Sequence, residues 1–186
     1  MLKTIWAGAA GLLLTANLSL AATTAQGERK DFQVAKDIAT TVQRYTQFTI
    51  FDDVNAYVKD GVVTLTGKVT MPYKRDDIEK RIARIDGVRG VTDRLDVLPV
   101  SQFDDELRYR ISRSIYNHSN FWTYAIMPNP PIHIVVEHGR VTLTGVVQSE
   151  VDRMLARSLA TQFGAFSVTN ALKTDAEVSD ALAKSE

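Results

Sequence analysis

The sequence contains nearly the same ten residues twice. "DGVVTLTGKV" runs from Asp60 to Val69 and "HGRVTLTGVV" from His138 to Val147, 78 positions later, and seven of the ten residues are identical. Repetition at a long, fixed interval indicates that a chain is built from copies of one structural unit. Whatever fold one copy adopts should therefore apply to both.

Each copy has the features of a β-hairpin. Asp60-Gly61 and His138-Gly139 predict two-residue turns of the primed types. The resulting pairing gives each hairpin one face of apolar or small residues: Val54, Ala56, Val58, Val63, Leu65 and Gly67 in the first, and Ile132, Ile134, Val136, Val141, Leu143 and Gly145 in the second. Such a face fixes the register, and the threonines of VTLTG then lie on the outer face as ordinary strand residues.

Two finer predictions follow from this pairing. Glu137 is placed opposite Arg140, where the two side chains are expected to form an ion pair across the strands. Gly67 and Gly145 lie opposite larger residues, which indicates either a bulge or the close approach of a helix.

Apolar residues at helical spacing flank both hairpins. Helices are predicted over residues 31–45 and 72–85 in the first copy and over 104–116 and 149–163 in the second, the last with Ser149 as a possible cap. Gly87 and Gly164 end the second helix of each copy and precede the strand-like segments 88–97 and 166–172. The order helix, strand, strand, helix, strand defines unit one, residues 31–98, and unit two, residues 102–174. The tail, residues 175–186, is a short helix or is frayed.

The first residues carry the pattern of a secretory signal peptide, residues 1–21. A basic residue, Lys3, precedes an apolar run that ends near Leu20, and Ser19 and Ala21 suit cleavage after Ala21; a second possible cut follows Ala25. The chain has no cysteine, which excludes a lipidated amino-terminal cysteine, disulfides and thiolate metal sites. We therefore expect an exported, soluble protein.

The two hairpins, each between amphipathic helices and followed by "GVRGVTDRL" or "AFSVTNAL", resemble BON domains (bacterial OsmY and nodulation) over about residues 31–174. The resemblance implies an α+β fold in which two helices of each unit pack on one face of a three-stranded mixed sheet. It also implies a non-enzymatic periplasmic module without cofactors, which binds phospholipid or other envelope surfaces and supports tolerance of envelope or osmotic stress. It supplies no catalytic residues.

Residues 117–131 form a link that departs from the short connection usual in this family. Phe121, Trp122, Tyr124, Ile126 and Met127 are concentrated in it, and Pro128, Pro130 and Pro131 then prevent a continuing helix. The link could insert aromatic side chains at a lipid boundary or grip a partner. It could equally cover the apolar edge of its own unit, and of the two interpretations we favour packing.

A second candidate surface is basic. Lys74, Arg75, Lys80, Arg81 and Arg84 cluster on the second helix of unit one, and of these Lys74, Arg75 and Arg81 are the candidate contacts with anionic headgroups. Asp76 and Asp77 precede Lys80 and Arg81 by four residues, so intrahelical ion pairs are expected to neutralise much of this charge. A solvated helix face is the better interpretation.

Catalytic, metal and nucleic-acid functions have little support. His118, His133 and His138 share no ligand spacing, and the oxygens near Asp52 and Asp53 lack the regular spacing of a calcium loop. The chain has 22 basic residues (lysine and arginine) and 22 acidic residues (aspartate and glutamate), so it has no net positive charge that would attract nucleic acid.

We therefore expect a phospholipid-binding module. The alternative is a protein-binding adaptor or chaperone-like module that uses Phe121 to Met127 or an exposed sheet edge.

Overall fold

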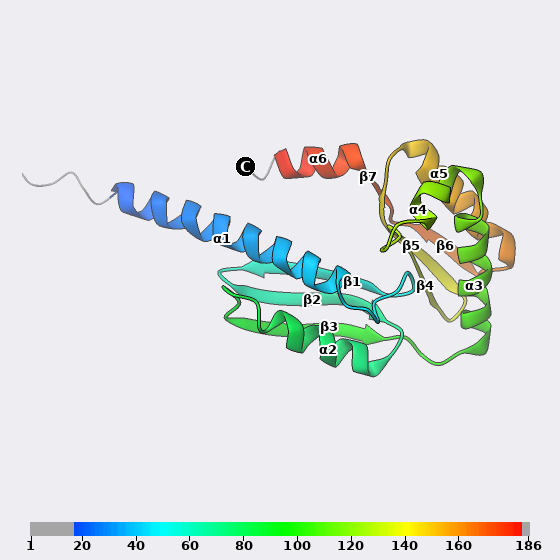
Figure 1. Cartoon of the computed structure of the whole chain (residues 1–186), viewed down its shortest axis with the longest axis horizontal. Helices are drawn as coiled ribbons and strands as arrows, with labels where there is room; N and C mark the ends of the chain where they lie inside the picture. The colour runs from blue at the N-terminus through cyan, green and yellow to red at the C-terminus, as the bar shows by residue number, and fades with distance from the viewer. Residues whose placement is uncertain (1–16, 184–186) are drawn as a thin grey trace, which may run out of the picture.

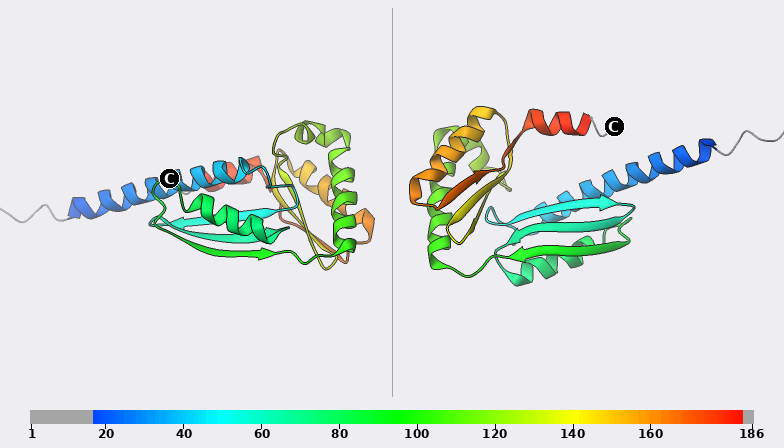
Figure 2. Two further views of the ribbon diagram at one scale, coloured as in Figure 1. Left: turned by 60° about the horizontal axis from the view of Figure 1, so that its bottom comes forward. Right: turned by 180° about the vertical axis from the view of Figure 1, so that it is seen from behind.

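The structure is a computed structural model that describes the backbone of residues 17–183 and the side chains of residues 30–181 and 183. Unit one has the expected order of elements: α1 (Asn17–Gln43), β1 (Asp53–Lys59), β2 (Val62–Val69), α2 (Pro72–Ile82) and β3 (Gly90–Val97). In Figure 2, right, its sheet lies in front of both helices, so that the helices cover one face and leave the other open.

Unit two repeats this order with additions. Its elements are α3 (Gln102–Tyr116), the 3-10 turn η1 (Ser119–Phe121), α4 (Trp122–Ala125), β4 (Ile132–Glu137), β5 (Arg140–Val147), α5 (Glu150–Ala160), the 3-10 turn η2 (Thr161–Phe163), β6 (Ser167–Asn170), β7 (Lys173–Thr174) and α6 (Asp175–Ala183). The tail is thus helical from Asp175, and Figure 1 shows α6 projecting from β7 away from the rest of unit two.

The predicted hairpin register is confirmed in both units. Val58 pairs with Val63 and Val54 with Gly67 in unit one, and Glu137 pairs with Arg140 in unit two. Asp60 and His138 both have φ 50°, and the glycines that follow also have positive φ, as a primed turn requires. The third strand runs parallel to the second in each unit, which makes both sheets mixed. In unit two that strand is interrupted, so β6 and β7 pair separately with β5.

Each unit has its own core. In unit one it is formed by residues from α1, both hairpin strands, α2 and β3, among them Val34, Ile38, Val63, Leu65, Ile78 and Ile82. In unit two all the apolar side chains of the hairpin's inner face are buried, and α3 contributes Leu107, Ile111 and Ile115. One expected inward position is wrong: Ala56 is exposed because it lies at the sheet edge. In α5 the buried residues are Ala156 and Ala160, and Val151 is 61% exposed.

The two matching glycines allow a close approach of backbone rather than of a helix. A Cβ atom on Gly67 would lie 2.2 Å from the carbonyl oxygen of Asp53, and one on Gly145 would lie 1.8 Å from that of Pro131. Both glycines also have φ above 110°, a region that residues with a side chain rarely adopt. Both predicted explanations are therefore wrong: no helix is the close neighbour, and one-to-one pairing of Gly67 with Val54 and of Gly145 with Ile132 leaves no bulge.

A carboxylate ties the first helix of each unit to its hairpin turn, which the sequence analysis missed. The oxygens of Asp31 accept hydrogen bonds from the backbone nitrogens of Asp60 and Gly61 at 2.6 and 2.9 Å. Asp104 does the same for His138 and Gly139 at 2.9 and 2.7 Å. The turn amides are thus satisfied from a distant part of the chain.

The units contact each other directly. The backbone nitrogen of Ile134 donates to the carbonyl oxygen of Ile50 at 2.7 Å. Glu137 forms an ion pair with Lys68 of unit one, at 2.8 Å, so the predicted Glu137–Arg140 ion pair is wrong although the two residues are opposite each other. Phe51 packs against the core of unit two. Unit two therefore packs against the loop that joins α1 to β1, as Figure 1 shows.

Helix α1 begins at Asn17, upstream of the predicted start at residue 31. Of the predicted signal peptide, residues 1–16 lie outside the described residues, and residues 17–21 belong to α1. Within residues 17–183 no helix has the length and apolar character needed to cross a bilayer.

Candidate binding surface

The link of unit two is attached to the core by two of its aromatic side chains. After α3, the turn η1 and helix α4 fold back over the unit, and the prolines then lead into β4. Phe121 is fully buried and Tyr124 is 4% exposed, and their rings stack with centroids 5.8 Å apart. Packing, the interpretation favoured from the sequence, is thus correct for these two residues.

The Tyr124 hydroxyl is also a hydrogen-bond acceptor whose counterpart in unit one is the carboxylate of an ion pair. Its hydroxyl oxygen accepts from the backbone nitrogen of Gln148 at 2.8 Å. At the matching position 78 residues earlier, the backbone nitrogen of Thr70 donates to the carboxylate of Asp52, also at 2.8 Å. Burial raises the pKa of the Tyr124 hydroxyl, so this group stays neutral. The link therefore replaces a charged acceptor by a neutral one.

The opposite side of the link is exposed. Trp122 is 60% exposed, Ile126 68% and Met127 42%. Trp122 and Ile126 are four residues apart and so lie on the same side of the helical turn. The Tyr124–Gln148 hydrogen bond brings the link beside the start of α5, where Val151 and Met154 are exposed as well. Trp122, Ile126 and Met127 are thus exposed apolar residues of a segment that the buried side chains of Phe121 and Tyr124 attach to the core.

The basic cluster of unit one is different from the predicted one. Lys74 is 4% exposed, and its ammonium lies 2.6 Å from the carboxylate of Asp52. Arg75 lies 3.5 Å from Asp93, and Arg81 stacks on the ring of Tyr45 at 4.7 Å. Lys74 therefore cannot contact a headgroup without unfolding of the site.

The intrahelical pairs expected on α2 are absent among the described side chains. Asp77 accepts a hydrogen bond from the Tyr45 hydroxyl at 2.9 Å, and Asp76 lies 3.6 Å from its neighbour Arg75. Neither carboxylate pairs with the residue four positions later. Asp77 therefore binds the loop that follows α1, through Tyr45, rather than neutralising the surface of its own helix.

Asp52 is the most heavily hydrogen-bonded side chain of unit one. It is fully buried and accepts from the backbone nitrogens and hydroxyls of Thr49 and Thr70 and from Lys74, at 2.6 to 2.8 Å. Burial alone would raise its pKa, but these hydrogen bonds outweigh burial and hold the pKa below its ordinary value. The cation beside it is the Lys74 ammonium, so this is a structural ion pair.

Among the described residues no histidine, aspartate or glutamate side chains gather in a group that could hold a metal ion. His133 stacks against Phe48, with ring centroids 5.2 Å apart, and burial lowers its pKa. His118 caps the turn that starts the link, where its Nδ1 accepts from the backbone nitrogen of Asn120 at 3.3 Å. His118 is thus accounted for by hydrogen bonding and His133 by packing, although the buried Nδ1 of His133 has no hydrogen-bond partner among the described residues.

These features define an α+β protein of two repeated units whose polar residues are used for structure and whose exposed apolar residues are available for binding. The model of the BON domain matches residues 30–99 and 104–176, and the chain belongs to the BON domain family. That is a family of binding domains, not of enzymes, and its members bind membranes or other envelope components.

Two solved structures are similar to the chain at 12% identity, and both are of CdsD, a structural protein of the type III secretion system of Chlamydia trachomatis. The first, its C-terminal domain, has a TM-score of 0.32, with 76% of this chain and 65% of that chain covered. The second has a TM-score of 0.31, with 82% and 68% covered. The chain thus spans about two thirds of the length of these structures. No curated protein matches the sequence.

Proposed function

We propose that the protein binds membrane surfaces of the cell envelope, with anionic phospholipid as the ligand, through the exposed side of the unit-two link. The observation that supports this most is the division of the link: Phe121 and Tyr124 hold it to the core, while Trp122 and Ile126 project into solvent. Tryptophan favours the border between water and lipid headgroups. A link held in place also loses little conformational entropy on binding.

The expected affinity is modest. Each exposed apolar side chain that enters the interface contributes about 1–2 kcal/mol, so Trp122, Ile126 and Met127 together support a reversible association. Anionic lipid adds attraction for basic side chains near the surface. Arg113, in the last turn of α3 immediately before the link, is exposed and suits this role. Lys74 has no part in it because it is buried.

Residues 22–186 contain a single tryptophan, Trp122, whose fluorescence reports on the link directly. With vesicles that contain phosphatidylglycerol at low salt, we expect co-sedimentation and a shift of its emission to shorter wavelength. Vesicles of phosphatidylcholine alone should bind less, and added salt should weaken binding because it screens charge.

The double variant W122S/I126S should lose co-sedimentation, while its thermal stability stays near that of the parent because both side chains are exposed. The matched control is Tyr57→Ser, which changes a 67% exposed aromatic residue of unit one. Binding by the double variant that equals that of the control would contradict the proposal. Failure of the parent protein to co-sediment with anionic vesicles at low salt would also contradict it.

The same proposal includes export into the periplasm through residues 1–21 and support of envelope integrity under osmotic stress. Its cellular test is fractionation of the tagged protein, together with growth of a deletion strain after osmotic shock. Recovery of the protein in the cytoplasm would contradict the export step and leave the vesicle experiment unaffected.

A second candidate function, a protein-binding adaptor, is favoured by one specific observation. The outer edge of β1 is open, whereas the matching edge in unit two is closed.

A further inference from the structure

The two units can be compared position by position. The hairpins correspond at an interval of 78 residues, and the first helices correspond at an interval of 73, because Asp31 and Asp104 both bind their hairpin turns. At the same interval, three buried residues of α1 match three buried residues of α3: Val34, Ile38 and Val42 match Leu107, Ile111 and Ile115. Differences between the units can therefore be assigned to single positions.

In unit two, the outer edge of the hairpin is closed. A two-residue turn directs the backbone groups of alternate residues of β4 away from β5, beginning with Val136. The carbonyl oxygen of Val136 accepts from Arg108 at 2.6 Å, and the backbone nitrogen of Ile134 donates to Ile50 at 2.7 Å. The hydroxyl of Tyr116 donates to the carbonyl of Ile132 at 2.6 Å and accepts from its nitrogen at 3.1 Å.

In unit one, the same edge is open. The matching residues are Val54, Ala56 and Val58, and within the described residues no hydrogen bond joins their outward backbone groups to a partner outside the sheet. The positions that match Arg108 and Tyr116 are occupied by Ala35 and Gln43. Unit one thus lacks the two long side chains that close the edge in unit two.

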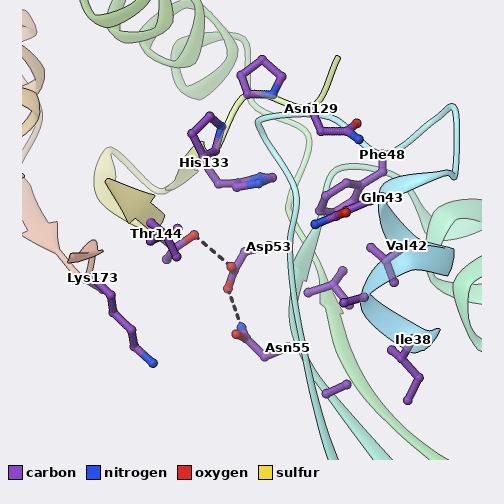
Figure 3. A pocket seen from close by; sticks show the side chains of 18 of the residues that line it. Ile38, Val42, Gln43, Phe48, Asp53, Asn55, Asn129, His133, Thr144 and Lys173 are labelled. Carbon is purple, nitrogen blue, oxygen red and sulfur yellow. Dashed lines mark hydrogen bonds between the residues drawn. The ribbon is translucent and has the colours of Figure 1, made fainter. Parts of the chain in front are cut away.

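A groove of about 730 Å³ lies along the first part of this open edge, where Asp53, Val54, Asn55 and Ala56 line it. Its volume is within the range of about 300–1,000 Å³ typical of ligand sites. Figure 3 shows β1 between the two walls. One wall is α1, with Ala35, Ile38, Ala39, Val42 and Gln43, and the other is unit two, with Pro130, Pro131, His133, Thr144 and Lys173. Ala35 and Gln43 are lining residues, so the groove occupies the space that long side chains fill in unit two.

We propose that this groove accepts an extended peptide segment, which adds to β1 as a further strand of the unit-one sheet. The backbone of the peptide would pair with Val54 and Ala56, the two outward-facing residues of β1 that line the groove. Its side chains would alternate between the apolar wall of α1 and the polar side where the Asp53 carboxylate holds Thr144 at 2.9 Å. The expected partner is therefore a segment in which apolar and polar residues alternate.

A peptide fits this edge better than the other possible occupants. The edge offers backbone donors and acceptors at every second residue, and a strand is the partner that matches this spacing. An acyl chain would cover these groups without satisfying them, which is unfavourable. A second copy would have to bring its own β1 out of an equally recessed groove. The inference gives the second candidate function its partner class and is independent of the lipid proposal.

The test begins with a displayed library of ten-residue peptides selected against the purified protein with both units present. We expect enriched peptides with alternating apolar residues, whose binding is measured by fluorescence anisotropy. In each such peptide, N-methylation of alternate backbone amides should abolish binding, while methylation of the intervening amides should be tolerated. A library without binders, or a sensitivity to methylation that does not alternate, overturns the proposal.

Two variants place the peptide in the groove. Ala56→Pro removes an outward backbone N–H without removing a bond of the sheet, a change that edge strands tolerate, and it should weaken binding at least about tenfold. Ala56→Ser is the matched control, because it keeps the N–H, and it should bind as the parent does. Equal affinities of these two variants overturn the proposal.

Ala35→Arg changes only the helical wall and should also block the groove, whether or not Ala56→Pro folds. Its binding to phosphatidylglycerol vesicles should match that of the parent, because the link is untouched; this separates failure of the groove from failure of the lipid surface. Peptide affinity that survives in Ala35→Arg overturns the proposal. Light scattering that shows a dimer dissociated by Ala56→Pro also overturns it, in favour of a second copy as the occupant.

Discussion

Replacing Asp52 by asparagine should destabilise unit one by about 3–5 kcal/mol, the usual effect of removing one partner from a buried ion pair. The carboxylate is fully buried and Lys74 is 4% exposed, so water cannot take over the lost contacts. The amide nitrogen of the asparagine would also face either the Lys74 ammonium together with the donors of Thr49, or, in the flipped orientation, the donors of Thr70, and donors that face each other remain unsatisfied.

The variant Lys74→Met provides the comparison. It leaves the Asp52 carboxylate with the backbone and hydroxyl donors of Thr49 and Thr70. We therefore expect a smaller loss, about 1.5–3 kcal/mol, as for one hydrogen bond to a charged group. The double variant should lose less than the sum of the two single losses, because the two side chains interact.

Hydrogen exchange of backbone amides is the suitable assay, because it resolves the units separately. The amide of Leu65 reports on unit one and that of Leu143 on unit two. Exchange of Leu65 should accelerate in Asp52→Asn far more than in Lys74→Met. A loss below about 1 kcal/mol in Asp52→Asn, well outside the range for a broken buried pair, would refute this account of the site, as would a larger loss in Lys74→Met.

Two further predictions concern tyrosines. Tyr124→Phe leaves the backbone nitrogen of Gln148 without its acceptor and should cost about 1–3 kcal/mol, measured by urea denaturation with Trp122 fluorescence as the probe; an unchanged stability would show that the hydroxyl is not needed. Burial and the hydrogen bond to Asp77 raise the pKa of Tyr45 from 10.0 to about 12. A group whose pKa is raised by folding stabilises the protein below its unfolded pKa, so this stabilisation should be lost between about pH 10 and pH 12, and Tyr45→Phe should show a shallower loss over that range in thermal denaturation.

The hairpins could be predicted from the sequence because their signals are local. Asp60-Gly61 and His138-Gly139 fix the turns, and alternation of apolar residues then fixes the register, as the structure confirms. Repetition of the phrase identified the two units, and helical spacing identified the helices around each hairpin. The family, too, could be recognised from these residues.

The interactions between distant segments could not be predicted in this way. Glu137 pairs with Lys68 across the units rather than with Arg140 across the hairpin, and nothing in the local sequence distinguishes these partners. Lys74 looked like a surface charge because it belongs to a basic run, yet it is buried against Asp52. Both cases depend on which elements meet, which a pattern within one segment does not record.

The candidate surface was predicted only in part. The aromatic composition of the link pointed to residues 121–127, but composition alone could not separate the buried Phe121 and Tyr124 from the exposed Trp122 and Ile126. The sequence does contain a signal for the groove: when the first helices of the two units are aligned on Asp31 and Asp104, Ala35 and Gln43 stand in place of Arg108 and Tyr116. That difference in side-chain size anticipates the groove.

The bond between Ile134 and Ile50 has a consequence for the order in which the protein matures. A bare strand edge invites pairing with other chains, and chains emerge from synthesis with their amino-terminal domain first. The loop that carries Ile50 is therefore in place before β4 is made, and it covers part of that edge as unit two folds. A circular permutant in which unit two came first would fold with that edge uncovered and should aggregate more readily during expression.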